Sequence, residues 1–285
     1  VLPDAARRAV IDAFLVLNHQ LRSEAPIPGI EELGYEDLGE YYLSLATMVY
    51  AFDTPAARLA LAQSAGGSAG MQRRAARAGD EAIPLLAERI RDGYEPGDAL
   101  ETMAFAWFWA DSTGAPLSER SRGIILDHLF AASRGNGYEL LRSLPVALGH
   151  ARDPLLLPLA RETLARLGAG EQAVWSEMAN EAIPAMEAAA SRMPAEALAG
   201  RLNRSVGAIC SDAAPGARNG ACRAMRNLAE TARGHIRAGR TGPASEVLSA
   251  LTARAAQALA AGALSADEHA LIRGGATLLR DRVGG

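Results

Sequence analysis

The chain has 285 residues, of which 49% are hydrophobic, so it can bury the core of one large domain or of two smaller ones. Its formal net charge of −4, without aromatic residues interleaved among the basic ones, argues against nucleic acid as a main partner. Aromatic residues make up only 5%, alanine is abundant, and β-branched runs with a period of two are nearly absent. This composition predicts an all-α fold.

All 29 basic side chains are arginine, and the sequence contains no lysine. One explanation is a GC-rich bacterial genome, in which lysine codons drift towards arginine codons. Another is selection on a protein that is delivered into a eukaryotic cell and gains by lacking ubiquitin-acceptor amines. That explanation would make the protein a secreted effector or toxin component. Because the sequence begins at Val1 and shows no signal peptide, we expect a trimmed or processed chain.

The N-terminal part contains two predicted helices and a flexible connection. Pro3 lies near the start of an amphipathic helix, and the longest apolar run, residues 41–52, predicts a core helix. That run is well short of the roughly 20 residues needed to cross a bilayer. The stretch SAGGSAGMQ (64–72) divides the chain into an N-terminal helical part, 1–66, and a repeat-like part, 67–285. The alternative is a surface loop within one continuous domain.

Capping signals predict where several helices begin and end. Thr54 and Asp153 each precede a proline, which is typical of an N-cap residue before the first helical position. Asp98 with Glu101, and Ser265 with Glu268, have capping-box spacing. Helices are expected to stop at Gly93, Gly114, Gly135, Gly149, Gly168, Gly200, Gly239 and Gly262.

The stretch LETMAFAWFWADS (100–112) concentrates aromatic residues in one predicted helix. Four rings within five positions point in nearly every direction around a helix, so some of them must be core. One ring could instead line a groove and act as a binding hot spot. The candidates for such a groove are Trp107, Trp109 and Asp111, with Asp98 as a polar neighbour.

Proline-containing apolar helices recur along the chain. In residues 147–168 a helix ends at ALGHA and Asp153 begins another, which predicts an antiparallel pair across a short turn. Early prolines also occur in ELLRSLPVAL (139–148), EAIPLLAERI (81–90) and EAIPAMEAAA (181–190). The pattern resembles the HEAT and armadillo families, best over 139–190 and more weakly over 79–110. The resemblance implies an irregular α-solenoid of antiparallel hairpins. Because no steady period of about 40 residues persists, a globular multi-helix bundle is the alternative.

The two cysteines enclose a turn-rich sequence. Cys210 and Cys222 flank SDAAPGARNGA, which places their sulfur atoms near facing helix ends. A disulfide closing such a loop would contribute about 3 kcal/mol to stability. The alternative is a pair of reduced, buried thiols. The bridge favours an exported location, periplasmic or secreted, over the cytoplasm.

A basic segment surrounds the two cysteines. Residues 201–240 contain eight arginines and two acidic residues. Of these, Arg223, Arg226, Arg233 and Arg237 have the spacing of one helix face. That stripe could receive phosphates, an acidic protein or an anionic lipid surface. The alternatives are an ordinary solvated face and a contact with the chain's own acidic segment at 23–57.

Motifs for metal binding and for phosphate binding are absent from the sequence. It contains no HExxH, no CxxC and no P-loop, so we expect no metal site and no cofactor, and no catalytic residue is identified. The sequence therefore predicts a non-enzymatic scaffold or adaptor that binds another protein or an anionic surface. One alternative is a secreted effector or toxin-associated protein with an activity on a helical fold. Another is an enzyme with an aromatic-lined pocket near residues 100–112.

Overall fold

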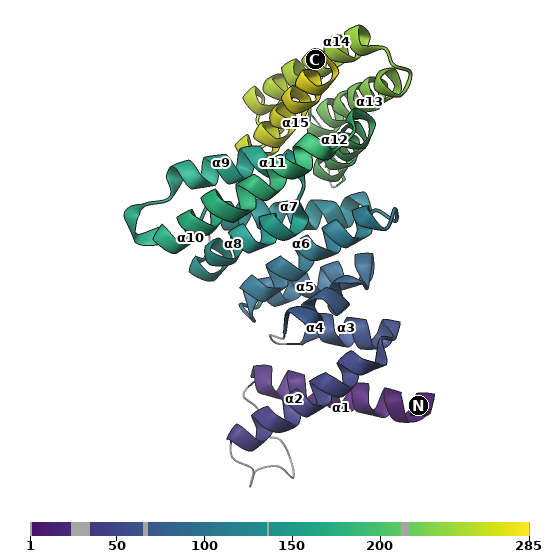
Figure 1. The fold of residues 1–285 in the computed structure, drawn as a ribbon, viewed down its shortest axis with the longest axis vertical. Coiled ribbons are helices and arrows are strands. Elements are labelled where there is room, and N and C mark those ends of the chain that lie inside the picture. The colour runs from purple at the N-terminus through teal and green to yellow at the C-terminus, as the bar shows by residue number, and fades with distance from the viewer. Residues whose placement is uncertain (1, 24–34, 65–67, 136, 212–216, 285) are drawn as a thin grey trace. The chain divides into compact units, whose positions relative to one another are not determined.

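The fold is all-α, as the composition predicted. The computed structural model describes residues 2–23, 35–64, 68–135, 137–211 and 217–284. Every regular element within these ranges is helical (Figure 1). The chain forms two compact units, Val1–Pro116 (unit 1) and Leu117–Gly285 (unit 2). The connection at 64–72 lies within unit 1, and its residues 65–67 fall outside the described part.

Unit 1 is built from helices of 8 to 20 residues around a mixed aliphatic and aromatic core. Its α-helices are α1 (Asp4–Ser23), α2 (Tyr35–Phe52), α3 (Pro55–Gln63), α4 (Ala69–Ala76), α5 (Ala82–Arg91) and α6 (Pro96–Ser112). Helix α1 packs against α2 and α3, and α6 packs against α4 and α5. The Phe14 ring stacks on Tyr42 with centroids 5.4 Å apart, and the side chain of Trp107 is fully buried.

The α-helices of unit 2 range from 6 to 21 residues in length. They are α7 (Glu119–Ser133), α8 (Tyr138–Ala151), α9 (Leu157–Arg166), α10 (Gln172–Glu177), α11 (Ile183–Arg192), α12 (Ala195–Ile209), α13 (Ala217–Arg237), α14 (Thr241–Ala260) and α15 (Ala266–Gly284). A π-helical segment, Met178–Ala182, joins α10 to α11 without a break. Residues 172–192 therefore form one long helix, which packs against α8 and α9.

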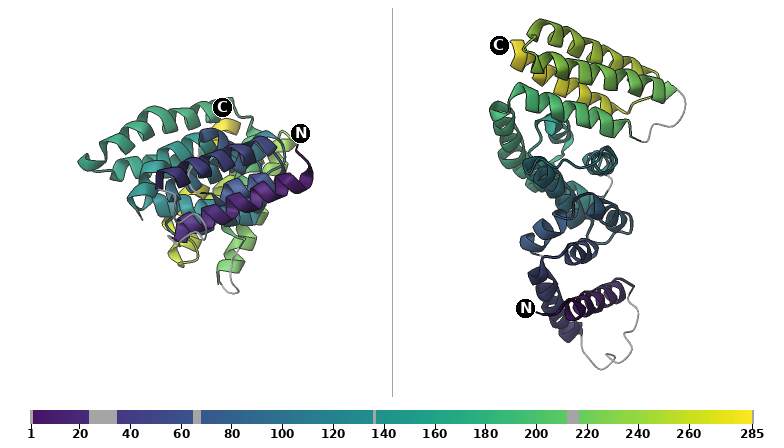
Figure 2. Two further views of the ribbon diagram at one scale, coloured as in Figure 1. Left: turned by 90° about the horizontal axis from the view of Figure 1, so that it is seen from below. Right: turned by 90° about the vertical axis from the view of Figure 1, so that its right-hand side faces the viewer.

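The last four helices pack together as neighbours. Helix α12 contacts α13 and α15, and α14 contacts the same two helices (Figures 1 and 2). Close approach of α15 depends on Gly275, since a Cβ atom there would lie 2.8 Å from Leu155 Cδ2 and 3.0 Å from Leu202 Cδ1. This tight contact joins α15 to α12 and to the turn before α9.

Most of the predicted helix starts are confirmed. The Thr54 hydroxyl accepts a hydrogen bond from the Ala57 N–H, and the Asp153 carboxylate accepts one from the Leu155 N–H at 3.0 Å. The box at Ser265 is complete, because its N–H donates to Glu268 and its hydroxyl accepts from the Glu268 N–H. These caps satisfy N–H groups that have no partner within the helix.

Three of the predicted boundaries are wrong. Asp98 does not cap a helix, because α6 begins two residues earlier at Pro96, whose fixed φ suits the first helical position. Gly149 and Gly200 do not end helices, since they lie inside α8 and α12. Packing of those helices against their neighbours outweighs the cost of about 1 kcal/mol that glycine carries inside a helix.

Candidate functional site

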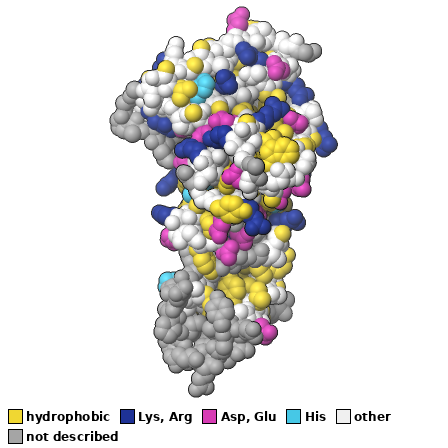
Figure 3. All heavy atoms as spheres, turned by 90° about the vertical axis from the view of Figure 1, so that its left-hand side faces the viewer, with side chains coloured by type: hydrophobic (Ala, Val, Ile, Leu, Met, Phe, Trp, Pro, Cys, Tyr) yellow, Lys and Arg dark blue, Asp and Glu magenta, His cyan; other side chains and the backbone are white. Residues whose placement is uncertain are grey.

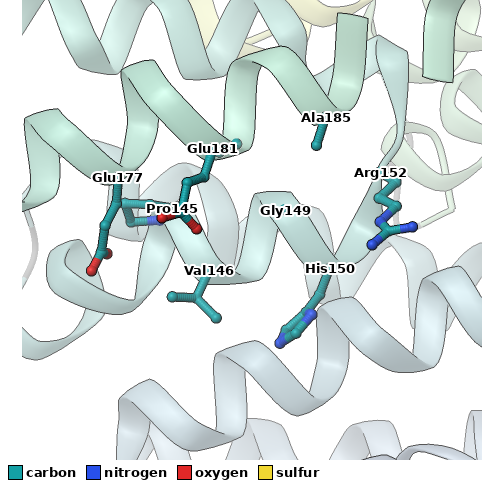
Figure 4. A pocket seen from close by; sticks show the side chains of 9 residues that line it. Pro145, Val146, Gly149, His150, Arg152, Glu177, Glu181 and Ala185 are labelled. Carbon is teal, nitrogen blue, oxygen red and sulfur yellow. The ribbon is translucent and has the colours of Figure 1, made fainter. Parts of the chain in front are cut away.

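A groove opens in unit 2 between α8 and the long helix 172–192. Its cavity has a volume of about 280 Å³, and side chains from both helices form its walls (Figure 4). The lining residues are Pro145, Val146, Gly149, His150 and Arg152 from the α8 side, and Glu177, Glu181, Ala182 and Ala185 from the opposite side. The two proline-containing segments 139–148 and 181–190 thus face each other across this groove.

The π-helical segment shapes one wall of the groove. The Ile183 N–H donates to the Met178 carbonyl, which is the i to i+5 pattern of a π-helix. Pro184 lacks an N–H and its ring would clash with the carbonyl of Asn180 in a regular α-helix. The wider π turn accommodates this ring. Single π turns occur frequently at functional sites, and here the turn carries Glu181 and Ala182 into the groove.

The opposite wall, formed by α8, has apolar side chains along its length and a strained backbone conformation at its C-terminal end. Pro145 is buried within α8, while Val146 is 36% exposed. Arg152 ends the helix in the left-handed region, with φ of +46°. That conformation costs a residue with a Cβ atom about 1–2 kcal/mol, and such strain occurs frequently at functional sites.

The charges of the groove are separated. Glu177 and Glu181 project from one wall above Pro145 and Val146, whereas Arg152 lies at the other end, near Ala185 (Figure 4). Both carboxylates are exposed, and neither forms an ion pair with a described residue. The groove therefore offers unpaired negative charge directly over apolar surface.

Exposed apolar side chains of unit 2 gather on the same two helices. Among its described residues, the large hydrophobic side chains with substantial exposure are Val146, Tyr138 and Trp175, the last two being 68% and 41% exposed. Tyr138 and Val146 belong to α8 and Trp175 to α10. Of these three side chains, Val146 lines the groove.

Comparison with protein-family models, curated proteins and solved structures found no match to this chain. Function is therefore inferred from the geometry of the two units. Among the described residues, no group of His, Cys, Asp and Glu side chains is arranged to hold a metal ion. Within the same ranges, none of the helices combines the length and the hydropathy that a bilayer crossing requires.

The predicted arginine stripe lies on α13, where the chain's own groups engage most of it. Arg226 donates to the Gly207 carbonyl at 2.8 Å and pairs with Glu119 of α7 at 2.9 Å. Gly207 permits this arrangement, because the Glu119 carboxylate occupies the space that a Cβ atom would fill. Arg226 therefore connects α7, α12 and α13.

The remaining stripe residues extend these contacts along α12. Arg237 pairs with Glu196 at 3.0 Å, Asn203 donates to Glu230 at 2.8 Å, and Arg233 pairs with the same glutamate at 3.4 Å. We call this row of contacts the α12–α13 seam; it comprises Glu196, Asn203, Gly207, Arg226, Glu230, Arg233 and Arg237. An incoming anion would compete with these carboxylates. Arg223 alone of the four predicted arginines is exposed without an ion pair to a described residue.

Charged side chains of both signs are mixed on the face of the molecule shown in Figure 3. The acidic segment 23–57, the suggested partner of the stripe, lies in unit 1 and is described only in part. Glu24, Glu31 and Glu32 fall outside the described residues, as do the side chains of Glu36 and Asp37. Glu40 is exposed on α2, and Asp53 pairs with Arg58 at 3.0 Å.

The two cysteines lie at the bonding distance of a disulfide. Their sulfur atoms are 2.14 Å apart, which joins the end of α12 to the start of α13, and both side chains are buried. Residues 212–216 between them fall outside the described part. Arg218 holds the same corner by donating to the Ile209 carbonyl at 2.9 Å and to Glu268 at 2.7 Å.

The aromatic cluster of α6 is divided between core and surface. Trp107 is fully buried, so it belongs to the core of unit 1. Trp109 is half-buried and carries the Arg77 guanidinium over its ring, with the arginine carbon 4.5 Å from the centroid. Asp111 is also half-buried, near the end of the helix. Of the three groove candidates on α6, Trp109 is the one with a ring near the surface.

Sequence reasoning did not single out Glu177, Glu181, Val146 or Trp175. A usable signal was present, because Glu177 and Glu181 are four residues apart and precede Pro184. A proline inside a long apolar helix predicts a local distortion, and acidic residues on that turn are exposed by it. The pairing of this turn with Pro145 on α8 required the fold.

Proposed function

We propose that the protein is a non-enzymatic helical scaffold whose groove, between α8 and helix 172–192, binds a helical segment of a partner protein. In this proposal, a basic side chain of the partner segment enters the groove. One observation carries the proposal: Glu177 and Glu181 stand unpaired over the apolar floor formed by Pro145 and Val146. A scaffold role is also what the likeness of residues 139–190 to HEAT and armadillo proteins implies.

The chemistry of the groove suits an arginine or lysine side chain. The aliphatic stem of such a residue packs on apolar surface while its charged end reaches the carboxylates. The volume of about 280 Å³ lies just below the range of about 300–1,000 Å³ that small-molecule sites occupy, and it suffices for one large side chain. Val146 and Ala185 line the same groove and supply apolar contact beside the anchor.

We further propose that the scaffold acts outside the bacterial cytoplasm. The cysteine pair at bonding distance supports this location, since disulfides persist in oxidising compartments. The absence of lysine agrees with delivery into a eukaryotic cell as well as with a GC-rich genome. Mass spectrometry of unreduced protein from its native host should show a mass two hydrogens below that of the dithiol. Two free thiols in that preparation would contradict export.

The groove is tested by fluorescence anisotropy with a labelled amphipathic helical peptide of leucine, alanine and arginine. We expect the intact protein to bind it, and Glu177→Gln with Glu181→Gln to weaken binding by at least about tenfold, since two charge-assisted contacts are lost. Val146→Lys should weaken binding similarly, because a positive charge on the floor repels the incoming arginine.

The matched control is Glu162→Gln with Glu246→Gln. Both residues are exposed in unit 2, neither lines the groove, and the net charge changes equally. This control should bind as the intact protein does. Absence of binding by the intact protein, or an equal loss in the control, would contradict the proposal.

A further inference from the structure

A second surface with different chemistry lies in unit 1, where α4 packs against α6. Arg73 of α4 lies over the Phe105 ring with its guanidinium carbon 5.8 Å from the centroid. Arg77, at the end of α4, lies over Trp109 at 4.5 Å. The arginines are four residues apart and so are the rings, so two stacked pairs form a short ladder along both helices.

Stacking leaves the hydrogen-bonding edge of each guanidinium available. Arg73 and Arg77 are both exposed, and neither forms an ion pair with a described residue. The planar guanidinium carries five N–H donors, and those that point away from the ring are directed towards solvent. The ring also restricts the side chain, so less rotamer freedom is lost when an anion binds.

Neighbouring charges do not neutralise the pair. Asp53 interacts with one arginine of the ladder, because its pKa is lowered by a hydrogen bond from Arg58 and by the charges of Arg58, Arg74 and Arg77. Asp53 already pairs with Arg58 at 3.0 Å and with Arg74 at 3.8 Å. Arg74 itself stacks on Tyr50 and donates to its carbonyl. Arg73 and Arg77 are thus exposed, and the acidic residue that acts on Arg77 is already paired with other arginines.

We propose that the Arg73–Arg77 ladder binds an acidic segment of a protein partner, with glutamate or aspartate carboxylates accepting paired hydrogen bonds from the two guanidinium groups. This site is separate from the groove of unit 2 and does not depend on it. Single-stranded nucleic acid fits less well, because an arginine already lies over one face of Phe105 and of Trp109, where a base would stack.

The test is anisotropy titration of the full chain with a labelled glutamate-serine peptide, and with its glutamine-serine counterpart as the neutral probe. We expect the acidic probe to bind and the neutral probe not to bind. Arg73→Gln with Arg77→Gln should weaken binding of the acidic probe by about tenfold or more. Arg8→Gln with Arg91→Gln removes the same charge from exposed positions of unit 1 and should leave binding unchanged.

A charge-conserving variant separates geometry from simple attraction. Arg73→Lys with Arg77→Lys keeps both charges but loses the planar fork and its stacking, so binding should fall several-fold. Equal affinity of the lysine variant and the intact protein would overturn the ladder as the recognition element. Equal loss in the Arg8 and Arg91 control would do the same. Tighter binding of a thymidine oligonucleotide than of the acidic peptide would assign the surface to nucleic acid instead.

Discussion

The α12–α13 seam and the groove beside α8 both present charged side chains at the surface of unit 2, but they use them differently. In the seam, Arg226, Arg233 and Arg237 pair with glutamates on α7, α12 and α13 itself. In the groove, Glu177 and Glu181 have no such ion pairs among the described residues. The seam therefore holds helices together, whereas the groove leaves charge available to another molecule.

This difference separates stability from binding. Charges that satisfy each other within a unit contribute to its packing and offer little to a partner, because a partner must displace the existing contacts. Unpaired charges over apolar surface contribute little to folding and can recognise an opposite charge. Substitutions in the seam should therefore change the stability of unit 2, and substitutions in the groove should change partner binding.

The largest effect should come from the disulfide that closes one end of the seam. Cys210→Ala with Cys222→Ala should lower the free energy of unfolding of unit 2 by about 3 kcal/mol, because the unfolded chain gains freedom in a closed loop. Denaturant unfolding followed by circular dichroism measures this change. Reduced intact protein is the control and should be destabilised similarly. An unfolding midpoint that neither treatment moves would contradict a structural bridge.

A smaller effect is expected within the seam at Arg226. Arg226→Ala removes the contacts to Glu119 and to the Gly207 carbonyl, and solvent already screens this half-exposed pair, so the loss should be about 1 kcal/mol. Arg223→Ala on the same helix removes an unpaired arginine and should leave stability unchanged. Equal destabilisation by both substitutions, measured by denaturant unfolding, would show that the seam has no special role.

The smallest effect on stability is expected in the groove. Glu177→Gln with Glu181→Gln should change the free energy of unfolding by no more than about 0.5 kcal/mol, slightly towards stability, because two like charges four residues apart no longer repel. Thermal unfolding measures this change. Destabilisation by more than about 1 kcal/mol would mean that the carboxylates support the fold, which would remove the contrast with the seam.

The sequence predicts the helix ends and the cysteine pair more readily than the contacts made by surface side chains. The cap at Asp153, the capping box at Ser265 and the cysteine pair depend on residues close in the chain, and the structure confirms them. The spacing of the α13 arginines correctly predicted one helix and one face. It could not predict that Glu119 and Glu196, distant in sequence, would occupy that face.

The groove is also hard to predict from the sequence, because residues distant in the chain form it. Its two walls come from segments around Pro145 and Pro184, which share an early proline but lie about 40 residues apart in the sequence. Their meeting depends on the packing of α8 against the π-helical segment, a long-range contact that periodicity does not encode. Likewise, the arginines of α4 and the rings of α6 come together only in the fold.

Hydrogen–deuterium exchange of the full chain, with and without the leucine–alanine–arginine helical peptide, tests the central assignment most directly. The peptide should slow exchange in α8 and in residues 172–192, and leave α13 unchanged. In the variant carrying Glu177→Gln and Glu181→Gln that protection should disappear. Protection of α13 without protection of α8 would contradict the assignment and return partner binding to the arginine stripe.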